Sequence, residues 1–427
     1  MRNHVAKGHA MPRARRRTAV RTLADVDRLV GQMTLDEKVG QCMTLGFYGT
    51  VITNEVVDWI ERLHCGGLRL TPHVNTSDSR DLVRRLAPYH TPAQYAEVLN
   101  DLQRIAAGRR LGLPLHMVTD QEGDLSVDYL HGGVNLFPSQ MGLAVTGSPA
   151  LTRKCARAVA QQLRAVGIHM VHSPVLDVNI NPRNPEIGCR SFSDSPDRCA
   201  RYGEAFMWGL TDGGVIATGK HFPGRGDSDV DAHHVLPVCA APRERLDAVE
   251  LYPYRHLIAR GLPAVMTAHN AYPALDESGL PASISRRIVT GLLREALGFD
   301  GVVTTDAMSM GGLRAICSTP EGCARAIAAG NDLVLVRDES PLIDEVFEQL
   351  DVLDRLRIDL DPHQFAFAVH GRADHSGPGV GLVPLLCERL LHLLHIVLQR
   401  LRLFQHGTQV TQSTKHATDS FFQERIT

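Results

Sequence analysis

Short runs of apolar residues recur along the chain, and most are separated by segments long enough to form a helix. Eight runs have the length and continuous hydrophobicity of buried strands. They occupy residues 42–47, 67–70, 115–119, 168–176, 215–220, 264–268, 301–305 and 332–336. Helical stretches such as 152–166 and 285–297 lie between them. Continuous apolar strands that alternate with helices predict a parallel sheet covered on both faces.

The number of candidate strands favours an α/β fold in which the sheet closes into a (β/α)8 TIM-type barrel. The alternative is an open doubly wound sheet, and the placement of polar residues decides between the two. The polar residues at or just beyond the carboxyl ends of the runs are Asp120, Asp177, Lys220, His221, His269 and Asp306. A barrel builds its active site from these ends, whereas an open sheet gathers its polar residues at one crevice.

Both ends of the chain differ from the barrel pattern. Residues 1–22 are rich in arginine and lack the apolar stretch of a secretory signal, so we expect a disordered basic arm. Residues 23–345 should form the barrel, and the spacing of Thr34 and Glu37 predicts a capping box at an early helix. Residues 346–427 form an atypical Leu/His-rich tail of uncertain fold. Its apolar part is open to three interpretations: a helix on a partner chain, a remnant of a second domain, or a translated frame slip.

The charge balance argues against nucleic acid or an anionic membrane surface as a partner. The chain carries 45 Lys and Arg against 47 Asp and Glu, a formal net charge of -2. No run is long enough to span a bilayer. Nine cysteines are scattered without a Cys-x-x-Cys pair, which indicates reduced thiols in a cytoplasmic protein. We therefore expect a small neutral or mildly charged substrate and no cofactor, while the oligomeric state stays open.

Asp306, at the end of one apolar run, and a loop that carries Asp231 and His233 are the candidate catalytic groups. A carboxylate delivered by a buried strand is rigid enough to attack an anomeric carbon, and a loop imidazole can protonate the leaving oxygen. Taken alone, an Asp at a strand end is more often a helix N-cap or a loop anchor. The interpretation therefore depends on the two groups together.

A metal centre is a competing interpretation, because His221, His233 and His269 could gather at the strand ends. The first strand lacks the His-x-His of a metal-dependent amidohydrolase barrel, and Lys220 beside His221 would repel a cation. We therefore expect no metal.

Five motifs between residues 120 and 308 occur in an informative order. They are Asp120-Gln121-Glu122-Gly123, Ser173-Pro174-Val175-Leu176-Asp177-Val178-Asn179, Arg190-Ser191-Phe192, Lys220-His221-Phe222-Pro223-Gly224 followed by Asp231-x-His233, and Thr305-Asp306-Ala307-Met308. In this order the chain resembles glycoside hydrolase family 3, and it looks most like the β-N-acetylglucosaminidase branch. The resemblance runs from about Val26 to about Val336, and five ordered motifs are far more specific than any one.

The resemblance implies a retaining mechanism in which Asp306 forms a covalent glycosyl-enzyme. It also implies that His233, oriented by Asp231, replaces the usual carboxylic acid as acid and base. An imidazole titrates near neutral pH, and a neighbouring carboxylate fixes its tautomer and supports its cation. The residues that would line the sugar subsite are Asp120, Arg190, Lys220 and His221.

The chain departs from the family pattern at two places. Gly123-Asp124-Leu125 stands where we expect Gly-Gly-Arg, which removes a basic residue from the pocket region, and Arg225 stands where the loop often reads Pro-Gly-His-Gly. These changes bear on substrate identity more than on reaction type.

The expected function is a metal-independent exo-β-N-acetylglucosaminidase that acts on peptidoglycan fragments. Three alternatives stay open. A phosphorylase of the same family would use phosphate as acceptor, which His233 would not repel as a carboxylate would. A β-glucosidase would lack the N-acetyl preference, and a non-catalytic sugar-binding barrel would bind without turnover.

Overall fold

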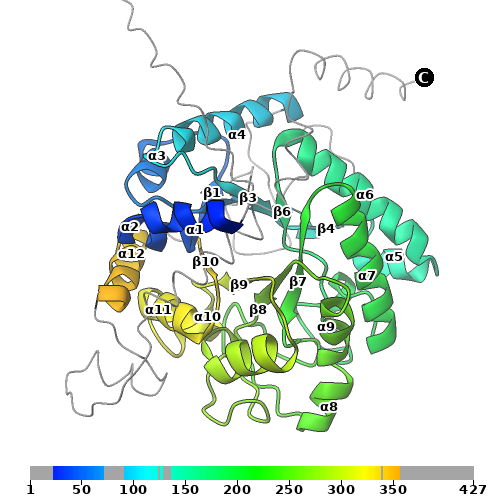
Figure 1. Cartoon of the computed structure of the whole chain (residues 1–427). Helices are drawn as coiled ribbons and strands as arrows, with labels where there is room; N and C mark the ends of the chain where they lie inside the picture. Colours follow the sequence, from blue (N-terminus) through cyan, green and yellow to red (C-terminus); the bar gives the residue numbers. More distant parts are fainter. Residues whose placement is uncertain (1–22, 72–90, 124–125, 128–135, 338–339, 356–427) are drawn as a thin grey trace, which may run out of the picture.

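The protein folds into a closed barrel of parallel strands surrounded by helices (Figure 1). A computed structural model describes residues 23–71, 91–123, 126–127, 136–337 and 340–355. The strand order around the barrel is β1-β10-β9-β8-β7-β6-β3-β2, and β2 pairs again with β1. The predicted (β/α)8 barrel is confirmed, and the open doubly wound alternative is wrong.

Each of the eight predicted runs contributes one barrel strand. The strands are β1 (Met43–Tyr48), β2 (Gly67–Thr71), β3 (His116–Thr119), β6 (Met170–Val171), β7 (Ile216–Phe222), β8 (Ala264–Thr267), β9 (Val302–Ala307) and β10 (Leu333–Val336). A small antiparallel hairpin, β4 (Gln121–Gly123) and β5 (Ser126–Val127), follows β3. Strand β6 is much shorter than predicted, because Pro174 has no N–H to donate to the ladder. Pairing with β7 resumes only at Val175, which bridges Lys220.

Helices form the outer ring of the barrel. They are α1 (Leu23–Gln32), α2 (Leu35–Gln41), α3 (Asn54–Glu61), α4 (Pro92–Ala107), α5 (Gln140–Val145), α6 (Pro149–Val166), α7 (Pro196–Asp212), α8 (Arg243–Ala248), α9 (Leu251–Ile258), α10 (Gly311–Arg314), α11 (Thr319–Ala329) and α12 (Ser340–Arg355), with short 3₁₀ turns η1 (Gly188–Arg190) and η2 (Ala282–Ile284) and a π-helix η3 (Arg287–Ala296). Helix α6 confirms the prediction at 152–166. The stretch at 285–297 is helical as predicted, but it is wound as a π-helix.

Local sequence signals explain where two of these helices begin and end. The Thr34 side chain accepts from the Glu37 N–H while the Glu37 side chain accepts from the Thr34 N–H, so the predicted capping box opens α2. Helix α6 begins with Pro149 at its first position and ends at Gly167, whose φ of 99° is the left-handed conformation that glycine adopts readily.

An apolar plug on the barrel axis supports the site above it. One residue from each of six strands forms a separate cluster: Val118, Met170, Ile216, Ala264, Val302 and Leu333. Side chains two apart on a strand share a face, so Thr304 stands above Val302 on the inner face of β9. The register against β10 shifts between Thr304 and Ala307, and Asp306 stands in this shifted segment at the carboxyl end of β9. Its carboxylate therefore lies at the carboxyl-terminal mouth of the barrel.

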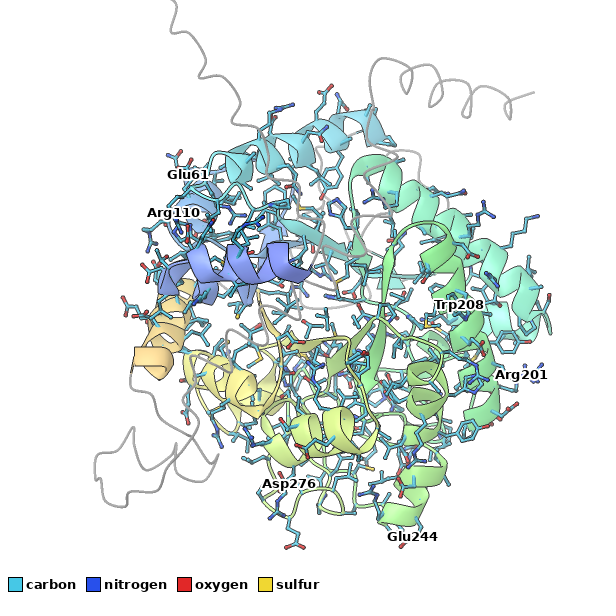
Figure 2. All side chains as sticks on the ribbon, in the orientation of Figure 1. Glu61, Arg110, Arg201, Trp208, Glu244 and Asp276 are labelled. Carbon is cyan, nitrogen blue, oxygen red and sulfur yellow. The ribbon has the colours of Figure 1, made fainter. Side chains whose placement is uncertain are left out.

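The charged surface lies on the outer faces of the helices, where Figure 2 shows Glu61, Arg201 and Glu244 pointing away from the barrel. Helix α12 packs against α11 and α2 and runs past the domain boundary that we expected at residue 345. The expected arm at 1–22 and the tail beyond Arg355 lie outside the described residues. Within the described part, no helix combines the length and the hydrophobicity needed to cross a membrane.

Candidate active site

Asp306 is the candidate nucleophile, and the Arg225 guanidinium lies beside it. Its Oδ1 accepts the backbone N–H of Ala307 at 2.8 Å, while Arg225 Nη1 lies 3.4 Å from Oδ2. The side chain is 15% exposed, so it is largely buried but reachable. Burial alone would raise the pKa of Asp306, but its neighbours, first of all the Arg225 guanidinium, outweigh burial and lower the pKa to about 2. The group is therefore a carboxylate at neutral pH.

Asp177 anchors the segment that carries Lys220, His221 and Arg225. Its carboxylate accepts the backbone N–H of Arg225 at 2.7 Å and lies 2.7 Å from His221 Nδ1. Burial, followed by the charge of Arg225, lowers the pKa of His221 well below its usual value, so this imidazole is neutral. Nδ1–H then donates to Asp177, and Nε2 accepts from Arg225 Nη2 at 3.0 Å. One buried carboxylate thus fixes both the loop backbone and the tautomer of His221.

The expected sugar subsite is a set of interlocked charges at the same mouth. Lys220 Nζ lies 2.9 Å from Asp120 and 2.6 Å from Glu122, and Arg190 makes a bidentate pair with Glu122 at 2.8 and 3.0 Å. Arg69, on β2, also pairs with Asp120. Burial opposes ionisation of Asp120, but Lys220 and Arg69 keep its pKa well below the usual range. Asp120 is 27% exposed and Lys220 only 3%, so Asp120 is the member of this pair that is open to a ligand.

His233 lies on the loop between β7 and α8, and two carboxylates meet its Nδ1. Asp231 Oδ1 is 2.6 Å from this nitrogen and Glu186 Oε1 is 2.9 Å from it. The hydrogen bond to Glu186 is the largest cause of the raised pKa of His233. The loop is tied to the end of β9, because the N–H groups of Gly311 and Gly312 donate to the carbonyls of His233 and Ala232. It is a docked loop in this structure.

The predicted site residues thus converge on one mouth of the barrel. The structure joins Asp306, Lys220, His221, Asp120 and Arg190 in one network, and it links the pair Asp231 and His233 to that network through Glu186 and Arg225. From the sequence we had assigned no role to Glu186, Arg69 or Glu122. Glu186 lies in the loop between β6 and η1, where the Asn184 side chain makes a turn by accepting the N–H groups of Glu186 and Ile187.

Two groups in the described part of the chain could supply three ligands to a metal ion, with their ligand atoms within 4.8 Å of one another. The first is Glu186, Asp231 and His233, which already bond to one another. The second is Asp227, Cys239 and Glu250, and Arg245 lies between its two carboxylates at 2.7 and 2.8 Å. A guanidinium already supplies the positive charge there.

Two other histidines, which we had considered as metal ligands, use both ring nitrogens within the protein. His221 bonds to Asp177 and Arg225, as described above. Nδ1 of His269 lies 2.7 Å from Ser283 Oγ, and Nε2 of the same ring lies 3.0 Å from the Ala307 carbonyl oxygen. His269 therefore braces the end of β9 beside Asp306.

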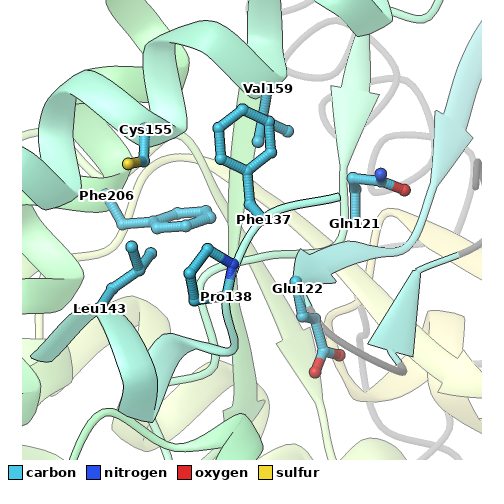
Figure 3. Close-up of a pocket in the computed structure, with 9 residues that line it drawn as sticks. Gln121, Glu122, Phe137, Pro138, Leu143, Cys155, Val159 and Phe206 are labelled. Atoms are coloured by element: carbon cyan, nitrogen blue, oxygen red, sulfur yellow. The ribbon is translucent and has the colours of Figure 1, made fainter. Parts of the chain in front are cut away.

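A small apolar pocket lies beside the site (Figure 3). Its lining comprises Gln121, Glu122, Gly123, Phe137, Pro138, Leu143, Cys155, Val159 and Phe206. The cavity is about 10 Å³, which is room for roughly one water molecule. Figure 3 shows the Glu122 carboxylate directed away from Phe137 and Phe206, and this carboxylate binds Arg190 and Lys220 instead. The pocket is too small for a sugar ring.

A parallel barrel with paired carboxylates and a loop imidazole at its mouth has the architecture of a glycoside hydrolase. Residues 34–361 match the glycosyl hydrolase family 3 N terminal domain. The chain belongs to glycosyl hydrolase family 3, which confirms the family resemblance and the class of enzyme.

Several similar proteins are named as β-hexosaminidases or β-N-acetylglucosaminidases. The chain is 34% identical over 258 residues to beta-hexosaminidase A of Pseudoalteromonas piscicida, a match that covers 57% of this chain and 43% of the relative. It is 34% identical over 269 residues to a beta-hexosaminidase of Thiobacillus denitrificans, covering 62% of this chain and 73% of the relative. A family 3 beta-N-acetylglucosaminidase from Paenibacillus sp. is similar in structure, with a TM-score of 0.70 at 36% identity, over 84% of this chain and 68% of that chain.

Proposed function

We propose that the protein is a retaining exo-β-N-acetylglucosaminidase that removes terminal β-linked N-acetylglucosamine through a covalent intermediate on Asp306. The observation that carries this proposal is the pairing at one barrel mouth of an ionised Asp306 with an imidazole whose Nδ1 is held by carboxylates. The names of the β-hexosaminidase relatives support the sugar preference.

In the first step an oxygen of Asp306 bonds to the anomeric carbon as the bond to the leaving oxygen breaks. The His233 cation gives its proton to that oxygen, so a glycosyl ester and a neutral imidazole remain. Asp306 suits this role because its low pKa keeps it ionised.

In the second step neutral His233 takes a proton from water, and the water oxygen bonds to the anomeric carbon. Asp306 leaves as a carboxylate, and His233 is a cation again. Two inversions at the same carbon retain the β configuration.

The sugar subsite would bind ring hydroxyls through its exposed charged groups. Asp120 is the partly exposed acceptor, while buried Lys220 and the 14% exposed Arg190 hold the carboxylates in place. A subsite built to bond each hydroxyl discriminates strongly against sugars that lack one. By the family resemblance we extend the proposal to peptidoglycan fragments as the substrate. The scattered cysteines without a Cys-x-x-Cys pair support the cytoplasm as the location.

A β-glucosidase activity is the second candidate, because one relative is named for both activities. The chain is 30% identical over 326 residues to a beta-N-acetylglucosaminidase/beta-glucosidase of Cellulomonas fimi, which covers 73% of this chain and 53% of that relative. Phosphorolysis stays an alternative, because His233 would not repel a phosphate acceptor as a carboxylate would. A non-catalytic barrel is disfavoured by the ionised Asp306 beside a supported imidazole.

The test is release of p-nitrophenol from the β-N-acetylglucosaminide and the β-glucoside, each with and without phosphate. We expect the wild type to cleave the N-acetylglucosaminide, Asp306→Ala to be inactive, and Asp300→Ala, at an exposed aspartate before β9, to keep full activity. Greater cleavage of the glucoside would favour the second candidate. Formation of a sugar 1-phosphate would indicate a phosphorylase, and binding without turnover would contradict the proposal.

A further inference from the structure

We propose that Glu186 is a positioning residue, which together with Asp231 holds the imidazole of His233 in its working orientation. This inference rests on the proposed role of His233 as acid and base. The acid/base unit then consists of three residues instead of two. Asp231 and His233 share one loop, and Glu186 belongs to a different loop.

Glu186 is the most enclosed member of the group. Its side chain is fully buried, whereas the side chains of Asp231 and His233 are 23% and 43% exposed. A bond to a buried carboxylate is less screened by water than a bond at the surface. Glu186 should therefore contribute at least as much as Asp231 to the electrostatic support of the imidazole.

The geometry determines which ring nitrogen faces the substrate. Both carboxylates approach the same atom, Nδ1, at 2.6 and 2.9 Å. An N–H at Nδ1 donates to them in the neutral and the charged ring alike, so the proton that is gained and lost belongs to Nε2. This is the nitrogen that is left to face the leaving oxygen.

Arg225 makes a buried carboxylate tolerable at this position. Its Nε lies 3.6 Å from Glu186 Oε2 and its Nη1 lies 3.4 Å from Asp306, and its side chain is 2% exposed. A buried charge is costly unless it is paired. The Arg225 guanidinium therefore connects Glu186, which supports His233, to the candidate nucleophile Asp306.

Glu186 also couples the acid/base loop to the sugar subsite. Its backbone carbonyl accepts from Arg190 Nη1 at 3.0 Å, and Asn184 Nδ2 donates to the Arg225 carbonyl at 2.8 Å. The segment that presents Glu186 to His233 thus also holds the two arginines in place. Movement of this segment would disturb both parts of the site.

The first experiment compares the pH dependence of kcat/KM in Glu186→Gln, Asp231→Asn and wild type. Glutamine keeps the size of the side chain and removes its charge. We expect the basic limb to move to lower pH in Glu186→Gln, with kcat/KM at pH 8 reduced roughly ten- to a hundred-fold. The matched control is Glu204→Gln. Glu204 on α7 lies 2.7 Å from His256 Nε2 on α9, so this variant removes another His–carboxylate pair away from the site. The control should leave the profile unchanged.

The second experiment does not depend on turnover: it titrates the His233 ring by NMR, assigned with His233→Asn. We expect the His233 pKa to fall in Glu186→Gln and to stay closer to the wild-type value in Glu186→Asp, which keeps the charge and serves if the glutamine variant does not fold. The proposal would be overturned if the His233 pKa were unchanged in Glu186→Gln, or if it fell equally in Glu186→Gln and Glu186→Asp. Glu186 would then be a packing residue. If the wild type cleaves no glycoside, the proposed function fails while the titration still tests Glu186.

Discussion

Arg225 places Nη1 3.4 Å from Oδ2 of Asp306, and its backbone N–H donates to the buried carboxylate of Asp177. The guanidinium is thus fixed at both its backbone and its charged end. Arg225 stands where the family loop often has a histidine, so this chain has a permanent cation beside the candidate nucleophile instead of a titratable one.

Replacement of this cation should change the acidic side of the activity profile. In Arg225→His the charge beside Asp306 becomes dependent on pH, and the pKa of Asp306 should rise above about 2. We expect kcat to fall about ten- to a hundred-fold at pH 6, the loss of one charge-assisted hydrogen bond. Rate measurements from pH 3 to pH 7 would check this, and an acidic limb identical to that of the wild type would contradict it.

The basic side of the profile should follow His233. Its pKa is raised, chiefly by the hydrogen bond to Glu186, and the first step needs the charged ring. Activity should therefore be lost as pH rises through a pKa above the usual value of about 6.5. Asp306 stays ionised down to about pH 2 and should not limit activity near neutrality. The measurement is kcat/KM against pH, and a decline centred below pH 6 would contradict this assignment.

His116 should make folding stability depend on pH. Its ring bonds Thr44 at 2.8 Å, and burial, followed by the charge of His172, lowers its pKa to about 4. The folded state keeps the ring neutral, while the unfolded chain binds a proton below about pH 6.5. Stability is therefore lost as pH falls from 6.5 to 4, by up to about 3 kcal/mol. Urea unfolding at pH 7.5 and pH 4.5 should show a smaller difference for His116→Gln; equal differences would contradict the prediction.

Gly226 should tolerate no side chain. A Cβ at this position would lie 1.8 Å from the carbonyl oxygen of Val178, so the loop would have to move away from the segment that holds Asp177. We expect Gly226→Ala to reduce kcat/KM at least about ten-fold and to lower stability by about 1–3 kcal/mol. Gly31→Ala is the control, because no atom lies within 4 Å of its Cβ and α1 should gain helix propensity. Similar behaviour of the two variants in activity and thermal unfolding would refute the steric explanation.

The fold could be predicted because each barrel strand is a short apolar run, a signal that is local in sequence. Three details needed more than this signal. Strand β6 is cut short at Pro174, the stretch at 285–297 winds as a π-helix, and Arg69 enters the site from β2, a strand that we had treated only as core. The first follows from the missing N–H of Pro174, which the length of the apolar run does not reveal. The other two depend on how neighbouring elements pack.

The candidate site could be predicted as far as its motifs reach. Asp306, Asp231, His233 and Arg190 belong to sequence motifs, and Asp120, Lys220 and His221 of the subsite stand at predicted strand ends. Glu186 lies 47 residues before His233, in a loop whose composition indicates only a turn. No periodicity connects the two, so only the folded chain reveals their contact.

The most direct test is to trap the intermediate with a fluorinated N-acetylglucosaminyl fluoride and to map the labelled peptide by mass spectrometry. We predict one covalent sugar per chain, attached to Asp306, and none on Asp306→Asn. A label on another residue, or turnover with retained configuration and no adduct, would contradict Asp306 as the nucleophile.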